Sequence, residues 1–192
     1  MIESVIAHHR SFRRNSRRRP GPDLAAVREI VSPRVWDSMR AASAQMSAAG
    51  IRHALIGGLA IGAHGYPRAT TDVDFLVGAE GFVEHSGGLV TLHPALPVMV
   101  QGVLVDTLSV APGDEHLEER LDDSPESAGV PVLALGPLVY LKLRAARRKD
   151  EADVVELLKA GADERAVRGY LREHAPELEA LFDRWGAAAA EE

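Results

Sequence analysis

The sequence predicts a mixed α/β protein: a small, mostly antiparallel sheet with helices on one face and a C-terminal helical subdomain. Two observations carry this prediction. Short apolar runs of strand length occur near residues 51–56, 72–77 and 103–108. Apolar residues at helical spacing precede the first run and dominate the chain after residue 136. We therefore predict a core over residues 23–135 and a helical subdomain over residues 136–186.

The first 22 residues differ in composition from the rest of the chain. Their arginines, set against Glu3, give a formal charge of +5, which leaves residues 23–192 at −11 to reach the total of −6. A segment with so little apolar content cannot fold on its own. We predict a disordered basic tail, and the functional alternative is an arm that contacts RNA.

Composition also excludes several classes of protein. Because the chain has no cysteine, it can form neither a disulfide framework nor a thiolate metal site. The longest apolar run, Ala54 to Ala63, contains three glycines and is too short to span a bilayer. The basic N-terminus is not followed by the apolar segment of a signal peptide. We expect a cytoplasmic protein with no membrane partner.

The helical pattern before the first strand has recognisable boundaries. Asp23 is a candidate N-cap, Ser32-Pro33 restarts the pattern, and Gly50 ends it. This helix should pack against the sheet and lead into a strand over residues 51–56. The strand stops at Gly57-Gly58, where the missing Cβ atoms allow a phosphate to approach the backbone. A short helix over residues 59–64 would direct its free N–H groups at that anion.

The strand over residues 72–77 carries two aspartates in alternation. A period of two puts Asp72 and Asp74 on one face, roughly 7 Å apart along the strand. Two like charges at this spacing repel each other unless a cation lies between them, and Mg²⁺ or Mn²⁺ with oxygen ligands fits. Together with the glycine pair, these residues predict a site for a metal-bound nucleoside triphosphate.

A third carboxylate lies further along the chain. After a predicted short helix over residues 79–86, residues 96–100 and 103–108 read as a hairpin with a turn at Gln101-Gly102. Asp106 interrupts the second strand, where burying a carboxylate without a partner is costly. If this strand pairs beside the one that holds Asp72 and Asp74, the three carboxylates converge.

Cationic residues occur before and after these strands. Arg68 is either a phosphate clamp or the partner in an ion pair that steadies its loop. After a predicted strand over residues 130–135, a helix opens at Gly136-Pro137. Lys142, Lys149 and Asp153 share one stripe of this helix if it is continuous, and the alternative is a solvated basic face.

Two stretches together resemble a known family. The first stretch resembles the nucleotidyltransferase superfamily related to DNA polymerase beta. It consists of a strand, Gly57-Gly58, a short helix, the run His-Gly-Tyr-Pro-Arg-Ala-Thr-Thr and then Asp72-Val73-Asp74. Within it, the chain looks most like the AbiEii-type proteins of bacterial abortive-infection and toxin-antitoxin systems. The segment Lys142 to Asp153 resembles that family's Lys-Leu-x-Ala-x-Arg-x-Lys-Asp-x-x-Asp pattern. Gly58 stands where some members have Ser.

The resemblance implies an activity and its residues. It implies Mg²⁺-dependent transfer of a nucleotidyl group from an NTP to a macromolecular acceptor, either a tRNA 3′ end or a protein hydroxyl. Asp72, Asp74 and Asp106 would hold the metal. The NTP would be bound by the residues Gly57, Gly58, Arg68, Lys142 and Lys149, with Asp150 completing the site.

The sequence is compatible with several partners and acceptors. A cognate antitoxin or toxin is an expected partner. Since residues 23–192 are acidic, RNA would have to approach over the arginine-rich helix or the N-terminal arm. Two alternatives are modification of a small hydroxyl compound, such as an antibiotic, and a catalytically silent nucleotide-binding or antitoxin module.

Overall fold

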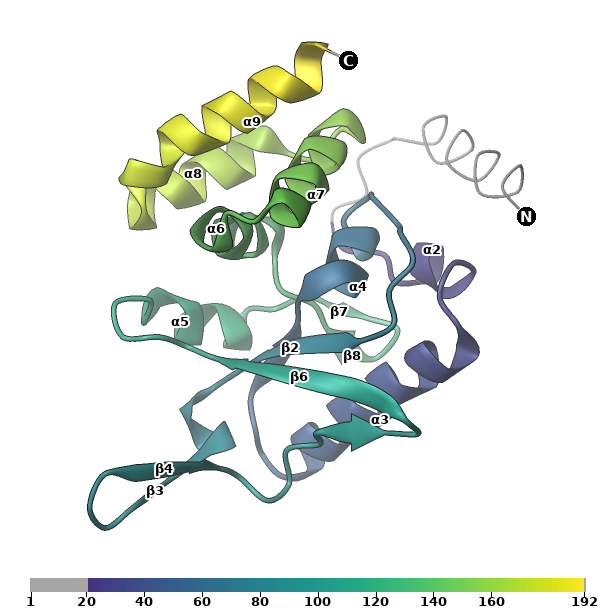
Figure 1. Ribbon diagram of the computed structural model, residues 1–192, viewed down its shortest axis with the longest axis vertical. Helices are drawn as coiled ribbons and strands as arrows, with labels where there is room; N and C mark the ends of the chain where they lie inside the picture. The colour runs from purple at the N-terminus through teal and green to yellow at the C-terminus, as the bar shows by residue number, and fades with distance from the viewer. Residues whose placement is uncertain (1–20, 192) are drawn as a thin grey trace.

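The computed structural model describes residues 21–191, so most of the predicted basic tail lies outside the described residues. Its centre is a four-stranded sheet in the order β1-β2-β6-β5 (Figure 1). The strands are β1 (His53–Leu55), β2 (Val73–Val77), β5 (Met99–Val100) and β6 (Val103–Ser109). The β2–β6 pair is parallel, and the β1–β2 and β5–β6 pairs are antiparallel. The predicted fold class, mixed α/β with mostly antiparallel pairing, is confirmed.

One face of the sheet is covered by a helix. α3 (Pro33–Ala48) packs against the sheet strands and lies behind β6 in Figure 1. Val103 and Val105 of β6 are buried, whereas Leu104, Asp106 and Leu108 are exposed. Because side chains alternate along a strand, the three exposed residues share the face that α3 does not cover.

The predicted ends of the first helices are close to the observed ones. Ser32 caps α3 by accepting a hydrogen bond from the Val35 N–H, and Gly50 follows the helix with a left-handed φ of 71°. α2 (Ala25–Arg28) starts after Leu24, so the predicted cap at Asp23 is one residue early. Asp23 still accepts a hydrogen bond from the Ala25 N–H. α4 (Gly57–Ala63) begins at the glycine pair itself.

The segment after β2 differs from the prediction. In place of a helix over residues 79–86, a single 3₁₀ turn, η1 (Ala79–Gly81), leads into a hairpin of β3 (Phe82–His85) and β4 (Leu89–Leu92). Gly87 and Gly88 both have positive φ and form its turn, which a helix cannot contain. The β5–β6 hairpin is confirmed, with Gln101 and Gly102 at positive φ.

A short connection leads from the sheet to the C-terminal helices. It contains α5 (His116–Asp122), β7 (Glu126–Ser127) and β8 (Val130–Pro131). The predicted strand over residues 130–135 is therefore shorter than expected, with one further bridge between Leu55 and Val132. The helices are α6 (Leu135–Ala145), α7 (Arg148–Lys159), α8 (Glu164–His174) and α9 (Glu179–Glu191), with the 3₁₀ turn η2 (Pro176–Leu178) between the last two.

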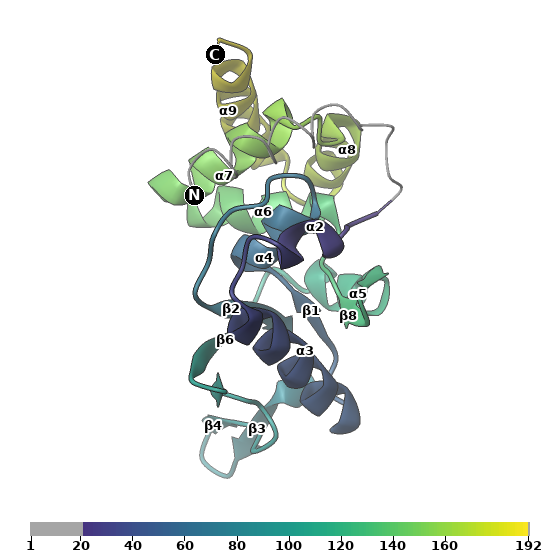
Figure 2. The ribbon, with the colours of Figure 1, turned by 90° about the vertical axis from the view of Figure 1, so that its right-hand side faces the viewer.

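The predicted long helix is not continuous. It breaks at Ala146, which has a left-handed φ of 46°, and this residue separates α6 from α7. The four C-terminal helices gather at one end of the molecule, next to α4 (Figures 1 and 2). Within residues 21–191, none of the helices is both long and apolar enough to cross a membrane.

Candidate functional site

Three carboxylates meet at the centre of the sheet. Asp72 precedes β2, Asp74 lies in β2, and the register pairs Asp74 with Asp106 of the parallel strand β6. One oxygen from each of the three side chains lies within 4.8 Å of the others. The structure therefore brings together the three acidic residues that the sequence singled out.

The electrostatics of this cluster favour a cation. Burial raises the pKa of Asp74, and the negative charges of Asp72 and Asp106 raise it further. Asp72 is oriented by a hydrogen bond that the Thr70 hydroxyl donates to Oδ1. Because all three candidate ligands are carboxylates, the cluster could hold a hard divalent cation such as Mg²⁺ or Mn²⁺.

The glycine pair makes room for neighbouring side chains. Gly57 has a φ of 63°, and a Cβ there would lie 1.9 Å from Oδ2 of Asp74. A side chain at position 57 would therefore displace the carboxylate from its place. A Cβ at Gly58 would lie 3.1 Å from Nη1 of Arg68. The approach of Asp74 therefore requires glycine at position 57, whereas at position 58 the end of the Arg68 side chain would have to shift only slightly.

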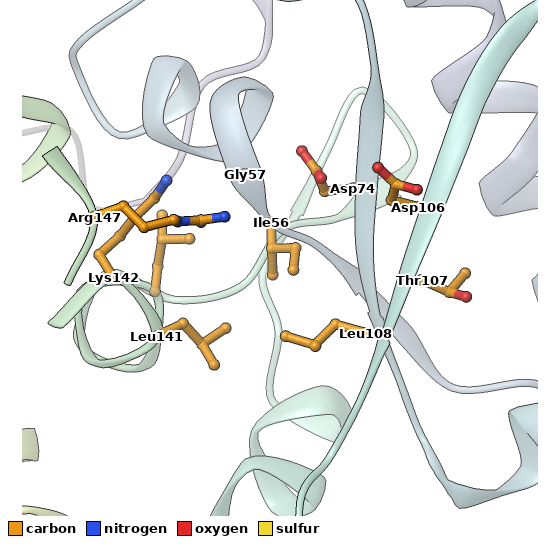
Figure 3. A pocket seen from close by; sticks show the side chains of 10 residues that line it. Ile56, Gly57, Asp74, Asp106, Thr107, Leu108, Leu141, Lys142 and Arg147 are labelled. Carbon is orange, nitrogen blue, oxygen red and sulfur yellow. The ribbon is translucent and has the colours of Figure 1, made fainter. Parts of the chain in front are cut away.

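A cavity of about 320 Å³ opens beside the carboxylates. Figure 3 shows Asp74 and Asp106 on one side of it and Lys142 and Arg147 on the other. The remaining lining is mostly apolar and comes from the start of α4, from β6 and from α6: Ile56, Gly57, Thr107, Leu108, Leu138 and Leu141. The cavity thus joins an acidic wall, a basic wall and an apolar floor.

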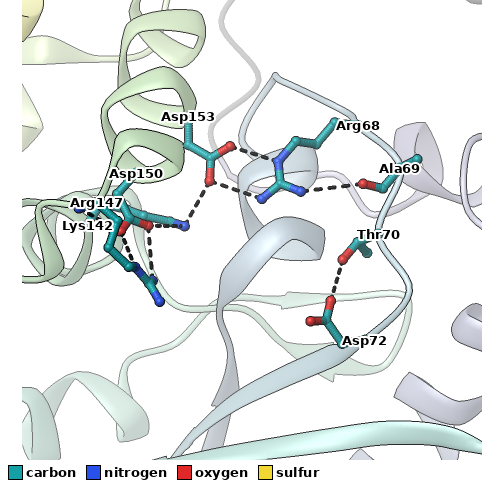
Figure 4. Close-up of polar contacts among 8 residues, drawn as sticks. All are labelled: Arg68, Ala69, Thr70, Asp72, Lys142, Arg147, Asp150 and Asp153. Atoms are coloured by element: carbon teal, nitrogen blue, oxygen red, sulfur yellow. Dashed lines mark hydrogen bonds and ion pairs between the residues drawn. The ribbon is translucent and has the colours of Figure 1, made fainter.

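The basic wall is a network of ion pairs (Figure 4). The Lys142 ammonium is buried and donates to Asp150 at 2.9 Å and to Asp153 at 2.8 Å. Arg68 pairs with Asp153 through Nε at 2.7 Å and Nη2 at 3.1 Å, and Arg147 Nε donates to Asp150 at 2.6 Å. Three cations against two carboxylates leave the network with one excess positive charge.

The network depends on the break between α6 and α7. Lys142 and Asp153 are eleven positions apart, which along an unbroken helix would separate them by about 16 Å. The turn at Ala146 folds α7 back, so that Asp150 and Asp153 both reach Lys142. Although burial alone would raise the pKa of Asp150, hydrogen bonds from Arg147 and Lys142 lower it.

The predicted cationic residues have different positions in the structure. Lys142 lines the cavity but is held between two carboxylates. Arg68 forms an ion pair with Asp153. An ion pair was one of the two interpretations of Arg68 from the sequence. Lys149 is exposed on α7 outside the cavity lining, and its charge acts to lower the pKa of Asp74 from a distance. Asp153 pairs with Arg68 and Lys142 rather than with Lys149.

Sequence reasoning missed Arg147. Its side chain is 60% exposed, lines the cavity and faces the acidic wall. The basic run from Lys142 to Lys149 signalled a cationic surface, but which member enters the cavity depends on the turn at Ala146.

Comparison with solved structures finds a distant likeness. The chain is similar to the crystal structure of an antigenic nucleotidyltransferase-like protein from Paracoccidioides brasiliensis, at 15% identity and a TM-score of 0.41. The match covers 80% of this chain and 94% of that chain. No protein-family model and no curated protein matches the sequence. This likeness is too weak to assign a function to the chain.

Proposed function

We propose that this protein is a divalent-metal-dependent nucleotidyltransferase that moves a nucleotidyl group from an NTP to a macromolecular acceptor. The observation that carries the proposal is the convergence of Asp72, Asp74 and Asp106 opposite a basic wall across one cavity. A nucleoside triphosphate with its metal needs these features side by side: hard ligands for the cation, positive charge for the phosphates and apolar surface for the base.

The chain's own residues have distinct roles in this proposal. Asp74 and Asp106 are held by adjacent strands, and Thr70 orients Asp72, so the donor set is preorganised. A divalent cation bound there would relieve the repulsion among the carboxylates and stabilise charge on the transferring phosphoryl group. Arg147 is the cation best placed to meet the phosphates, since its exposed side chain can turn toward them.

The proposed reaction is an in-line displacement at the α-phosphorus. The acceptor hydroxyl oxygen forms a bond to phosphorus, the bond from phosphorus to the bridging oxygen breaks, and pyrophosphate leaves. Asp106 is the most exposed of the three carboxylates and would take the hydroxyl proton. Most of the catalytic effect in such a transfer comes from positioning and charge stabilisation, which matches a rigid donor set on two paired strands.

The finer assignment rests on sequence motifs. The order of Gly57-Gly58, the Asp-Val-Asp strand and the segment from Lys142 to Asp153 supports an AbiEii-type enzyme. On that basis we propose Mg²⁺ as the cation, a tRNA 3′ end or a protein hydroxyl as acceptor, and a toxin-antitoxin or phage-defence context with a cognate partner. Lys149 would approach the phosphates from the rim of the cavity.

One observation favours a second candidate, a nucleotide-binding module without catalysis. Both Lys142 and Arg68 are already satisfied by carboxylates, so a triphosphate would have to compete with Asp150 and Asp153 for them. Binding of Mg²⁺ and an NTP without release of pyrophosphate would favour this module.

The test uses calorimetric titration of each NTP in the presence of Mg²⁺. We expect Asp74→Asn to abolish metal-dependent NTP binding, because the substitution removes a charged ligand from the acidic cluster. Asp37→Asn is the matched control, since Asp37 is exposed on α3, the helix that covers the other face of the sheet. An unchanged titration for Asp74→Asn would contradict the proposed site.

A second variant separates binding from transfer. Asp106→Ala should reduce transfer of label from an α-labelled NTP more than it reduces NTP binding, because Asp106 is proposed to receive the proton. Equal loss of both would indicate that Asp106 acts only as a ligand or structural group.

A further inference from the structure

A cluster of aromatic and titratable side chains joins α5 to α8, outside the lining of the cavity. The rings of His116, the first residue of α5, and His174, the last residue of α8, are stacked. Their centroids are 4.6 Å apart and their planes are 6° from parallel. Tyr140 and Tyr170 pack around the stack, with ring centroids 5.0 Å and 5.6 Å from that of His116. Two imidazoles from distant parts of the sequence therefore share one small contact.

The cluster contains buried polar atoms without partners. Nε2 of His116, Nε2 of His174 and the Tyr170 hydroxyl are buried and have no hydrogen-bond partner within residues 21–191. The same holds for Nε of Arg120, which lies about one helical turn after His116 on α5. Because buried polar atoms without partners are uncommon in folded proteins, four of them around one contact call for an explanation beyond packing.

Positive charge near the stack opposes its protonation. Burial lowers the pKa of His116, and positive charge on His174 and Arg120 lowers it further. Nη1 of Arg120 is 3.8 Å from a carboxylate oxygen of Asp123, but that carboxylate is exposed. The two tyrosines of the cluster stay uncharged, because burial raises their pKa values. A proton on each imidazole would therefore bring like charges close together.

The carboxylates that face the stack can offset only part of this charge: Asp114, Glu115 and Glu173. Asp114 already accepts hydrogen bonds from the Tyr140 hydroxyl and from Arg144, the latter at 3.0 Å. Glu115 is exposed and accepts a hydrogen bond from a backbone N–H of its own loop. Glu173 is 69% exposed, with Oε2 3.7 Å from Nε2 of the neighbouring histidine. Water and salt screen the charges of both glutamates.

The stacked state consequently binds fewer protons than a state in which the two rings are apart. An imidazole in water has a pKa of about 6.5, so two separated histidines take up two protons in mild acid. Two imidazolium rings at the separation of His116 and His174 repel each other, so the stack holds at most one proton. The state that binds more protons gains population as the pH falls.

We propose that His116 and His174 form a pH-sensitive latch, which holds α5 against α8 at neutral pH and releases α5 in mild acid. α8 keeps its place because it packs against α6 and α9, whereas α5 has only seven residues. The negative end of the α8 dipole also favours a cation at His174. The latch goes beyond the proposed function and does not depend on it.

Release of α5 would reach the cavity through α6. Asp114, two residues before α5, is bonded to Tyr140 and Arg144 of α6. The same helix supplies Leu141 and Lys142 to the cavity lining. When α5 moves away, α6 loses the contacts that hold it on this side. The latch would therefore connect the pH of the solution to the position of the basic wall.

The experiment measures the distance between α5 and α8 by pulsed electron spin resonance at about pH 7.5 and about pH 5. Because the chain has no cysteine, nitroxide labels attach only to introduced ones. Glu119→Cys on α5 and Arg172→Cys on α8 change exposed positions. We expect one distance at neutral pH and a second, longer one in acid. The ratio of separated to docked molecules should rise by up to about tenfold per pH unit below about pH 6.5, because separation takes up one further proton.

Variants isolate the stack from the other titrating groups. His116→Phe keeps a flat ring in the stack but takes up no proton, so the distance should be the same at both pH values. His85→Gln is the control, because His85 is exposed in the β3–β4 hairpin, and it should leave the acid response unchanged. His53 and His64, whose pKa values burial also lowers, are retained throughout. Circular dichroism checks that each variant is folded, and His116→Gln replaces the phenylalanine variant if that one is not.

A second pair of labels locates the motion. Glu151→Cys on α7 with Arg172→Cys on α8 should give the same distance at both pH values, since neither helix is α5. Three results would overturn the latch. They are an unchanged distance between α5 and α8 in acid, an acid response that persists in the His116 variant, and an equal change between α7 and α8, which would indicate general unfolding.

Discussion

Both charged walls of the cavity contain aspartates, but only those of the basic wall are paired with cationic side chains. On the basic side, Asp150 and Asp153 are buried and each accepts hydrogen bonds from two cationic side chains. On the acidic side, no ion pair within residues 21–191 holds Asp72, Asp74 or Asp106, and they lie against one another. The pKa of Asp150 is lowered, whereas that of Asp74 is raised.

This difference separates what each wall does. Removing a carboxylate that is fully paired within the chain destabilises the fold, because the removal leaves buried positive charge uncompensated. Carboxylates that repel one another destabilise the metal-free chain, and such a cluster is retained where a ligand supplies the missing charge. Substitutions on the two walls should therefore change stability in opposite directions.

The largest effect is expected for Asp153→Ala. The substitution removes the shared partner of Lys142 and Arg68 and should lower the free energy of unfolding by about 3–5 kcal/mol. Urea denaturation measures this loss. Glu151→Ala, at an exposed position of the same helix, is the control and should stay within about 0.5 kcal/mol of wild type. Equal effects of the two variants would show that the basic network is not structural.

A divalent cation should stabilise the chain by a somewhat smaller amount. At a Mg²⁺ or Mn²⁺ concentration one hundred times its dissociation constant, the free energy of unfolding should rise by about 2.7 kcal/mol. Thermal unfolding with and without a chelator measures the gain. Asp74→Asn should lose most of it, and Asp153→Asn should retain it. A gain of the same size in Asp74→Asn would place the cation elsewhere.

Without metal, Asp74→Asn should itself be stabilising. Removing one of three mutually repelling charges should raise the free energy of unfolding by roughly 0.5–2 kcal/mol. The measurement is chemical denaturation in a chelator at neutral pH. A destabilised variant would mean that a hydrogen bond to Asp74 outweighs the repulsion.

That gain should depend on pH with a definite sign. The folded-state pKa of Asp74 is raised above its ordinary value of 3.8. The contribution of this group to the free energy of unfolding of the wild type is therefore fully present below pH 3.8. It is lost as the pH rises through the raised folded pKa. The difference between Asp74→Asn and wild type should therefore be near zero below pH 3.8 and grow above it. If the difference in the free energy of unfolding between Asp74→Asn and wild type did not change with pH, the ionisation of Asp74 would not be the cause of the gain in stability.

The smallest effect is expected at the turn between α6 and α7, the two helices that carry the basic wall. Ala146→Gly relieves a left-handed residue that has a Cβ, which should stabilise the chain by up to about 1 kcal/mol. Thermal unfolding checks the sign. Ala145→Gly, at the last residue of α6, should instead be slightly destabilising.

The sequence predicts the acidic wall better than the basic one, for a physical reason. Asp72 and Asp74 follow from the period of two within one strand, and Asp106 stands out as a carboxylate in an apolar run. The pairing that brings Asp106 next to Asp74 joins strands far apart in the sequence. The sequence therefore predicted that the three carboxylates meet only if these two strands are neighbours. Most strand and turn signals near the site were sufficient to predict the local structure there.

The basic wall depends on a break that local propensity opposes. Ala146 lies among good helix formers with no proline or glycine near it, so the pattern reads as one helix. The ion pairs of Lys142 with Asp150 and Asp153 form between segments on the two sides of this break. The position of Arg147 in the cavity also depends on the break. The error at residues 79–86 has the opposite cause, since Gly87-Gly88 was taken as a helix stop although it is a hairpin turn.

The β3–β4 hairpin has a consequence for handling the purified protein. It forms a two-stranded sheet of its own, so the outer edge of each strand has no neighbouring strand in the described chain. Leu89 and Val90 are more than half exposed on it. Open strand edges with apolar side chains promote self-association, so concentrated solutions should form oligomers through this hairpin. A lysine in place of Val90 should keep the chain monomeric without touching the cavity.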